Sequence, residues 1–224
     1  MLRPTQKTSL LSPGCLTFPP SWELLIWPAS GSARATLYSE LIGFSSLWAP
    51  GVQASQGLKL LTMERDIRVL ENELEKESRK IKTVIKARGL KHQNLNGKTF
   101  TSFHTDHRHH LLSFVSKLSP SPDWMVGVSM MEMCLTNCTW LDRQDILLYP
   151  WDIGVDSGVT YQSEASPTTP SQAVQRITSQ HPQDENSPFY RPEGGPVEPL
   201  ARVVIRKLRV GRRRRLWKKV KHHS

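Results

Sequence analysis

The chain has 224 residues, enough for one sizeable hydrophobic core. Its low apolar fraction of 38%, with 16 Pro and 13 Gly, predicts many turns and loops. The formal net charge of +10 is confined to one end, because ten Lys or Arg and no Asp or Glu occur from Arg206 onward. The rest of the chain is neutral, so the basicity describes only the tail, and no apolar run reaches the roughly 18 residues that span a bilayer.

Residues 1–36 are rich in Pro, Ser and Gly and show no hydrophobic period, which predicts a disordered or non-homologous N-terminal segment. Pro pairs and Glu23 interrupt this segment, so it makes a poor signal-peptide core. Between residues 64 and 88, apolar side chains recur at helical spacing among charged ones, without Gly or Pro. This pattern indicates one amphipathic helix, which we expect to pack on its own domain and not in a coiled coil.

The region from about 100 to 208 has the sequence pattern of a β-protein. Short apolar or alternating runs are separated by spacers that contain Pro, Gly, Ser and Asn. The predicted strands are 109–118, 125–133, 145–150, 158–163 and 200–208. Several short strands joined by turn residues favour a sandwich or barrel over a sheet of βαβ units.

Three aspartates, Asp123, Asp152 and Asp156, each lie at a predicted boundary between a strand and a loop. If the two strands before Asp123 and Asp152 are neighbours, the three carboxylates converge, and like charges then oppose one another's ionisation. Oxygen ligands without a nearby His or thiol suit Ca²⁺, so the pattern predicts a calcium site. The alternative is that these aspartates form turns by bonding to the local backbone.

The segment HTDHRHH, residues 104–110, offers a second group of possible ligands. On a strand, His107 and His109 would share a face and could bind a transition metal, although a polar lead-in to the next strand is the favoured interpretation. The sequence has no nucleophile elbow, no phosphate-binding Gly loop and no H-E-x-x-H. We therefore expect neither an enzyme nor a small-molecule substrate.

Cysteines and the basic tail leave several alternatives open. Cys15 and the pair in CLTNC, Cys134 and Cys138, are too few for a zinc site and do not define a disulfide framework. The sequence Asn137-Cys138-Thr139 is a glycosylation sequon, which matters only in a secreted protein. The tail over 209–224 could contact heparin-like glycans, nucleic acid or anionic lipid, could direct nuclear import, or could be a solvated terminus.

The segments SPDW, PWDIGVDSG, RITSQHP and SPFYRPEGG, together with LARVVI, resemble the spondin domain of the F-spondin/mindin family, with F-spondin the nearer of the two. The likeness places a spondin domain at 37–208. It implies an all-β, C2-like antiparallel β-sandwich with one Ca²⁺ on Asp123, Asp152 and Asp156. It also implies secretion, binding to cell-surface receptors or matrix components, and support of adhesion and axon outgrowth.

The chain departs from the family pattern at its start and in its acidic loop. The opening strand and the cysteines that usually pair with those matched by Cys134 and Cys138 are not recognisable, so we expect an exposed sheet edge. Ile153 and Val155 stand where the family usually has Ala and Thr. The leading hypothesis is a secreted, calcium-binding matrix adhesion module, and the alternative is a polyanion binder that acts through the tail.

Overall fold

The computed structural model describes residues 20–28, 36–43, 47–87, 99–137 and 139–208. Two antiparallel sheets and two short helices make up this part of the chain. The all-β sandwich predicted from the sequence is therefore confirmed. The N-terminal residues 1–19 and the basic tail 209–224, both expected to be disordered, lie outside the described residues.

The four-stranded sheet has the order β4-β1-β10-β7, and the six-stranded sheet has the order β3-β2-β5-β6-β8-β9. Every strand pair is antiparallel. The strands of the first sheet are β1 (Ser21–Pro28), β4 (Thr99–His104), β7 (Arg143–Leu148) and β10 (Ala201–Lys207). Those of the second are β2 (Thr36–Gly43), β3 (Ile85–Ala87), β5 (Leu111–Ser119), β6 (Trp124–Glu132), β8 (Trp151–Asp152) and β9 (Gln175–Arg176).

Strand β1 corrects the prediction that all of residues 1–36 are disordered. It lies between β4 and β10 and pairs with both, so the sandwich has a strand where a missing one was expected to leave an exposed edge. Its sequence SWELLIWP alternates, and Trp22, Leu24 and Ile26 are fully buried. The alternation was present in the sequence, but the Pro residues that flank it obscured the strand pattern.

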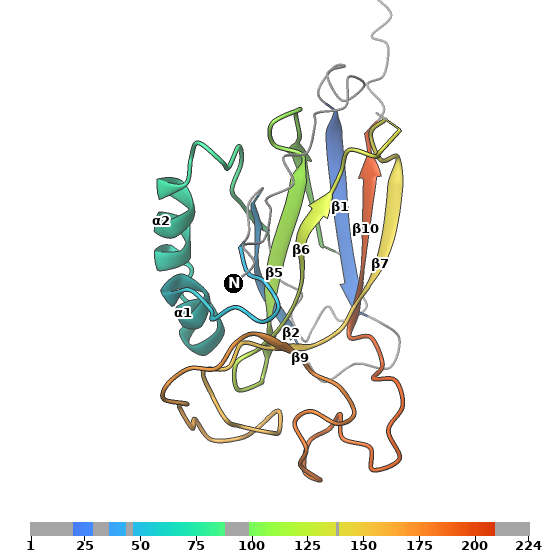
Figure 1. Cartoon of the computed structure of the whole chain (residues 1–224). Coiled ribbons are helices and arrows are strands. Elements are labelled where there is room, and N and C mark those ends of the chain that lie inside the picture. The colour runs from blue at the N-terminus through green and yellow to red at the C-terminus, as the bar shows by residue number, and fades with distance from the viewer. Residues whose placement is uncertain (1–19, 29–35, 44–46, 88–98, 138, 209–224) are drawn as a thin grey trace, which may run out of the picture.

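Two hydrophobic cores use opposite faces of the six-stranded sheet. The core between the sheets contains Trp22, Phe103, Phe114 and Trp124. The second core packs the helices against the outer face of β5 and β6, and its members include Leu58, Leu61, Leu70, Leu74, Val115 and Met125. Neighbouring residues of one strand thus point into different cores, and Figure 1 shows the helices beside the sheet that they cover.

The single helix predicted over 64–88 is wrong. The structure has two helices, α1 (Gln56–Glu64) and α2 (Arg68–Lys76), and residues 85–87 form strand β3. Helix α1 ends at Arg65, which adopts a left-handed conformation and donates its N–H to carbonyls of the last turn. Helix α2 ends where residues 77–80 are exposed, since a helix without a packed apolar face gains little tertiary stabilisation.

The predicted strands 109–118, 125–133, 145–150 and 200–208 are confirmed as β5, β6, β7 and β10. The strand predicted over 158–163 is wrong, because these residues form turns. The hydroxyl of Ser163 accepts the N–H of Thr160, and the carboxylate of Asp156 accepts that of Gly158. Such local bonds satisfy the backbone that a strand would have paired with a neighbour.

Candidate metal centre

The structure brings Asp123 to the loop that carries the other two aspartates. Asp123 lies in the turn between β5 and β6, immediately before Trp124, and its side chain is fully buried. Its Oδ2 atom accepts the backbone N–H of Val155 at 2.7 Å and that of Asp156 at 3.1 Å. Asp123 therefore lies against the loop that carries Asp156.

The loop after β8 is shaped by its own carboxylates. Asp152 Oδ1 accepts the N–H of Gly154 at 2.7 Å, and Asp156 accepts that of Gly158 at 2.8 Å and that of Ser166 at 2.9 Å. Gly154 has a φ of 77°, and a Cβ atom there would lie 2.6 Å from the carbonyl oxygen of Gln172. Only glycine satisfies both conditions, which explains the glycine between the two aspartates.

Burial and mutual repulsion make this cluster electrostatically unfavourable. Burial, followed by the charge of Asp152, raises the pKa of Asp123 to about 7, although the N–H groups of Val155 and Asp156 act in the opposite direction. Burial also raises the pKa of Asp152, against the N–H of Gly154 and the positive influence of His181. The cluster therefore gains from any cation that enters it.

One carboxylate oxygen lacks the hydrogen bond that burial normally demands. Asp123 Oδ1 is inaccessible to solvent and has no hydrogen-bond partner, whereas Oδ2 of the same side chain accepts two. A buried polar atom without a partner calls for a physical explanation, and a cation beside the carboxylate is one that its chemistry allows. The donor set fits Ca²⁺, which prefers carboxylate and carbonyl oxygens.

The shell for such an ion is not complete in the structure. Within the described parts of the chain, no group of three or more His, Cys, Asp or Glu side chains is arranged to hold a metal ion. The carboxylates instead accept backbone N–H groups, as the alternative interpretation of turn-forming aspartates expected. The features of the cluster that favour a cation are its burial, its charge and the unpaired oxygen of Asp123.

A pocket of about 160 Å³ opens beside the cluster. Asp152 and Asp156 contribute to its wall, and His181 faces the same space with a buried Nε2 atom that has no hydrogen-bond partner. The remaining lining residues are Gly154, Ser157, Gly158, Val159, Thr168, Gln172 and Pro182. Sequence reasoning missed His181, which lies 29 positions after Asp152 and has no motif spacing to it.

Sequence reasoning also missed Lys117, a buried lysine in strand β5 that is 3% exposed. Burial lowers the pKa of its ammonium group to about 8, although the negative charges of Asp123 and Asp156 act in the opposite direction. A single charged residue inside the apolar run LLSFVSKL was the available signal. Lysine is almost never fully buried without partners, so a lysine at this position predicts polar or charged groups around its ammonium.

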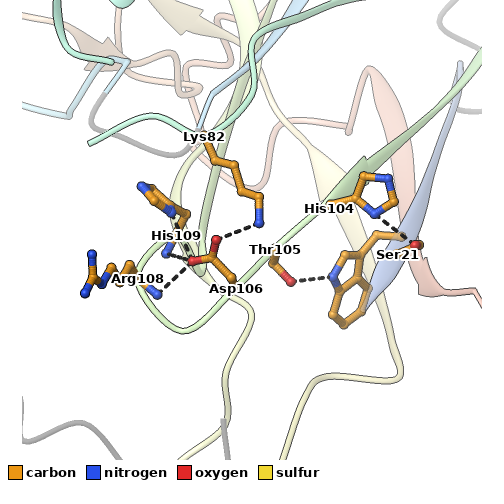
Figure 2. Close-up of polar contacts among 8 residues, drawn as sticks. Ser21, Lys82, His104, Thr105, Asp106, Arg108 and His109 are labelled. Carbon is orange, nitrogen blue, oxygen red and sulfur yellow. Dashed lines mark hydrogen bonds and ion pairs between the residues drawn. The ribbon is translucent and has the colours of Figure 1, made fainter. Parts of the chain in front are cut away.

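The histidine segment lies at the other end of β5 and forms no strand. Strand β4 ends at His104 and β5 begins at Leu111, so the less favoured possibility, that His107 and His109 share a strand face, does not occur. Figure 2 shows that Asp106 occupies the centre of this turn, where it accepts bonds from Lys82, from His109 and from the backbone of Arg108. Residues 105–110 are a turn closed by Asp106, as the preferred interpretation of a polar lead-in expected.

The sequon lies on an exposed turn after β6. Asn137 Oδ1 accepts the N–H of Thr139 at 3.2 Å and its hydroxyl at 2.6 Å, and both residues are exposed. Cys15 and Cys138 lie outside the described residues, so the pairing of Cys134 stays a prediction. No helix in the described ranges is long and apolar enough to cross a membrane.

An antiparallel β-sandwich with a buried aspartate cluster at one loop end defines the class of this protein. The Spondin_N family model matches residues 15–199, and the chain belongs to that family. The match begins upstream of residue 37, where the resemblance was expected to start, and includes strand β1.

Individual relatives support the same assignment. The chain is 38% identical to human Spondin-1 (Homo sapiens) and 37% identical to chicken Spondin-1 (Gallus gallus), in each case over 203 residues and 86% of this chain. It is 31% identical to human Spondin-2 over 194 residues and 85% of this chain. The match covers 25% of the length of human Spondin-1 and 54% of the length of human Spondin-2, so the chain spans about a quarter of the first and about half of the second.

Proposed function

We propose that this chain is a secreted, non-enzymatic module of the extracellular matrix that binds one Ca²⁺ through Asp123, Asp152 and Asp156. The observation that carries the proposal is Asp123 Oδ1, which is buried without a partner in a cluster of three carboxylates. Membership of the spondin family supports the matrix setting. The same family implies adhesion through cell-surface receptors or matrix components.

Bound Ca²⁺ would supply a double positive charge and accept oxygen ligands from several elements at once. The chain's own residues define where it would sit: Asp123 reaches the site from the β5–β6 turn, Asp152 from the end of β8 and Asp156 from the loop that follows. Joining these elements would stiffen the pocket wall formed by Asp152, Asp156 and their neighbours. We propose this wall as the part of the surface that a matrix partner meets, with neuronal adhesion and axon outgrowth as the processes it supports.

Secretion would make two covalent features possible. Asn137 is exposed within its sequon and is the proposed glycosylation site. Cys134 is the cysteine of the described chain that a disulfide would use, since oxidising compartments allow such bonds to persist. Both features can be read by mass spectrometry of protein expressed through a secretory pathway.

Calorimetric titration with Ca²⁺ tests the central proposal. Wild-type protein should bind one equivalent, and Asp152→Asn should bind at least about tenfold more weakly, because a carboxylate ligand is lost. Asp106→Asn is the matched control at the opposite end of β5 and should leave the affinity unchanged. Absence of calcium binding by folded wild-type protein would overturn the proposal.

The alternative, a polyanion binder, assigns function to the basic tail. It is favoured by one observation, the concentration of Lys and Arg after Arg206. Strand β10 ends at Lys207 and Leu208 donates its N–H to the carbonyl of Ser21, so a fair truncation removes only residues 209–224. If that truncation abolishes heparin and cell-surface binding while EDTA changes neither, the tail and not the acidic site is the functional element.

A further inference from the structure

The buried side chain of Lys117 is held by hydrogen bonds to three backbone carbonyls. Its Nζ donates to the carbonyl oxygen of Thr62, to that of Pro122 at 3.2 Å and to that of Ser121 at 3.4 Å. It is the one lysine in the described ranges whose side chain is buried. The side chain therefore joins helix α1, strand β5 and the turn that leads to Asp123.

This carbonyl cage fixes a positive charge behind the acidic cluster. Ser121 and Pro122 directly precede Asp123, so the turn that binds Nζ is the turn that positions the buried carboxylate. The charges of both Asp123 and Asp156 act on the ammonium group, and the guanidinium of Arg65 opposes it. Arg65 itself donates to the hydroxyl of Ser119, at the end of the same strand.

Burial and hydrogen bonds hold the ammonium group of Lys117 in place. It is enclosed by α1 on one side and by the Ser121–Pro122 turn on the other, and its three donors already match three acceptors. Burial lowers its pKa only to about 8, so the group remains mostly charged at neutral pH. An incoming divalent ion would therefore meet a fixed positive charge as well as the carboxylates.

We propose that Lys117 is an internal counter-cation that lowers the affinity of the acidic cluster for its divalent ion. The inference rests on the proposed calcium site and names a residue that sets the affinity of that site for calcium. Without an ion, Lys117 partly offsets the repulsion among the carboxylates; with an ion, its charge opposes binding. The expected result is weak binding, in the range of about 10⁻⁴–10⁻³ M that is typical of extracellular calcium modules.

Replacing Lys117 tests this role because two effects can be told apart. Loss of the charge should raise the affinity for calcium, whereas loss of the hydrogen bonds should lower the stability of the fold. Lys117→Met removes the charge at similar length, and Lys117→Gln removes it while keeping N–H donors for the cage. Calcium affinity should rise by about 3- to 10-fold in either variant, as expected for the loss of a nearby like charge. The melting temperature without calcium should fall, because buried carbonyls lose their partner.

The control is Lys82→Met, which removes a lysine paired with Asp106 before the start of β5 and should leave calcium affinity unchanged. If wild-type protein binds no calcium, the proposed site itself fails. If wild-type protein binds calcium but neither Lys117 variant binds it more tightly, only the inference about Lys117 fails. Loss of folding in both variants, with and without calcium, would also overturn it, since the role of Lys117 would then be structural.

Discussion

A buried or half-buried aspartate lies near each end of strand β5, and the pKa values of the two carboxyl groups are shifted in opposite directions. At the start of β5, hydrogen bonds from Lys82, Arg108 and His109 overcome the effect of burial and hold the pKa of Asp106 well below its usual range. At the far end of β5, burial and the charge of Asp152 raise the pKa of Asp123 to about 7. Figure 2 shows the first environment, in which Lys82 points directly at the carboxylate.

This difference separates a structural carboxylate from a candidate ligand. Asp106 closes a turn, has its negative charge compensated by the contacting Lys82, and also forms a hydrogen bond with the ring of His109. Asp123 closes a contact between two loops but keeps Oδ1 unpaired, and Lys117, whose charge interacts with it, bonds to carbonyl oxygens. Buried charge without a contacting partner persists at functional sites more often than elsewhere.

The largest expected effect comes from neutralising each aspartate in calcium-free protein. Asp106→Asn should lower the free energy of unfolding by about 2–3 kcal/mol, because charge-assisted bonds to Lys82 and His109 are lost. Asp123→Asn should raise it by about 1–3 kcal/mol at pH 8, because a buried and repelled charge is removed while the carbonyl oxygen still accepts both N–H groups. Urea unfolding measures both changes in the free energy of unfolding, provided that the variants and the wild type unfold with the same dependence on urea concentration. Equal destabilisation by the two variants would contradict the contrast between Asp106 and Asp123.

The second effect is a pH dependence of the calcium-free protein. A raised folded-state pKa makes Asp123 favour the protonated form, so its contribution to stability is full below about pH 4 and is lost as the pH rises through about 7. The depressed pKa of Asp106 gives the opposite slope, but only below about pH 4. Between pH 7.5 and 5.5, the melting temperature should therefore rise by about 3–6 °C.

Two controls isolate the source of that pH dependence. Asp123→Asn should flatten the profile between pH 7.5 and 5.5, whereas Asp106→Asn should not. Saturating calcium should reverse its sign, since protons then compete with the ion for the same carboxylates. A profile that keeps its slope in Asp123→Asn would assign the effect to another group.

The smallest effect is expected from Lys82→Met. The Lys82–Asp106 pair is partly exposed, with side chains 32% and 23% accessible, so its removal should cost at most about 1 kcal/mol. Asp106 would keep its bonds to the backbone of Arg108 and His109. Thermal unfolding in low and high salt measures the change, and a loss above about 2 kcal/mol would show that the lysine does more than compensate charge.

Local patterns predicted most of the sandwich and failed where the chain depends on distant partners. The apolar runs of β5, β6, β7 and β10 are readable because each is bounded by turn residues. Strand β1 was missed because prolines flank it, yet it is stabilised between β4 and β10. The helix was misplaced because the periodicity over 64–88 does not reveal that residues 85–87 pair with β2.

The acidic site shows the same division. The spacing of Asp152 and Asp156 around Gly154 was enough to predict a tight, charged loop, because only glycine tolerates the backbone conformation there. Asp123 was predicted with them because it too lies at a boundary between a predicted strand and a loop, and the resemblance to a family added the expectation that all three bind one ion. No spacing could have supplied Lys117 or His181, which reach the cluster through the helix packing and through the loop after β9.

The sequence by itself determined the all-β class, the turn chemistry of the acidic loop and the identity of its carboxylates, because these depend on neighbouring residues and on period-two alternation. Only the tertiary structure decided which groups surround those carboxylates. Burial, an unpaired oxygen and a caged ammonium are properties of elements that are distant along the chain, and they exist only after the strands and helices have packed.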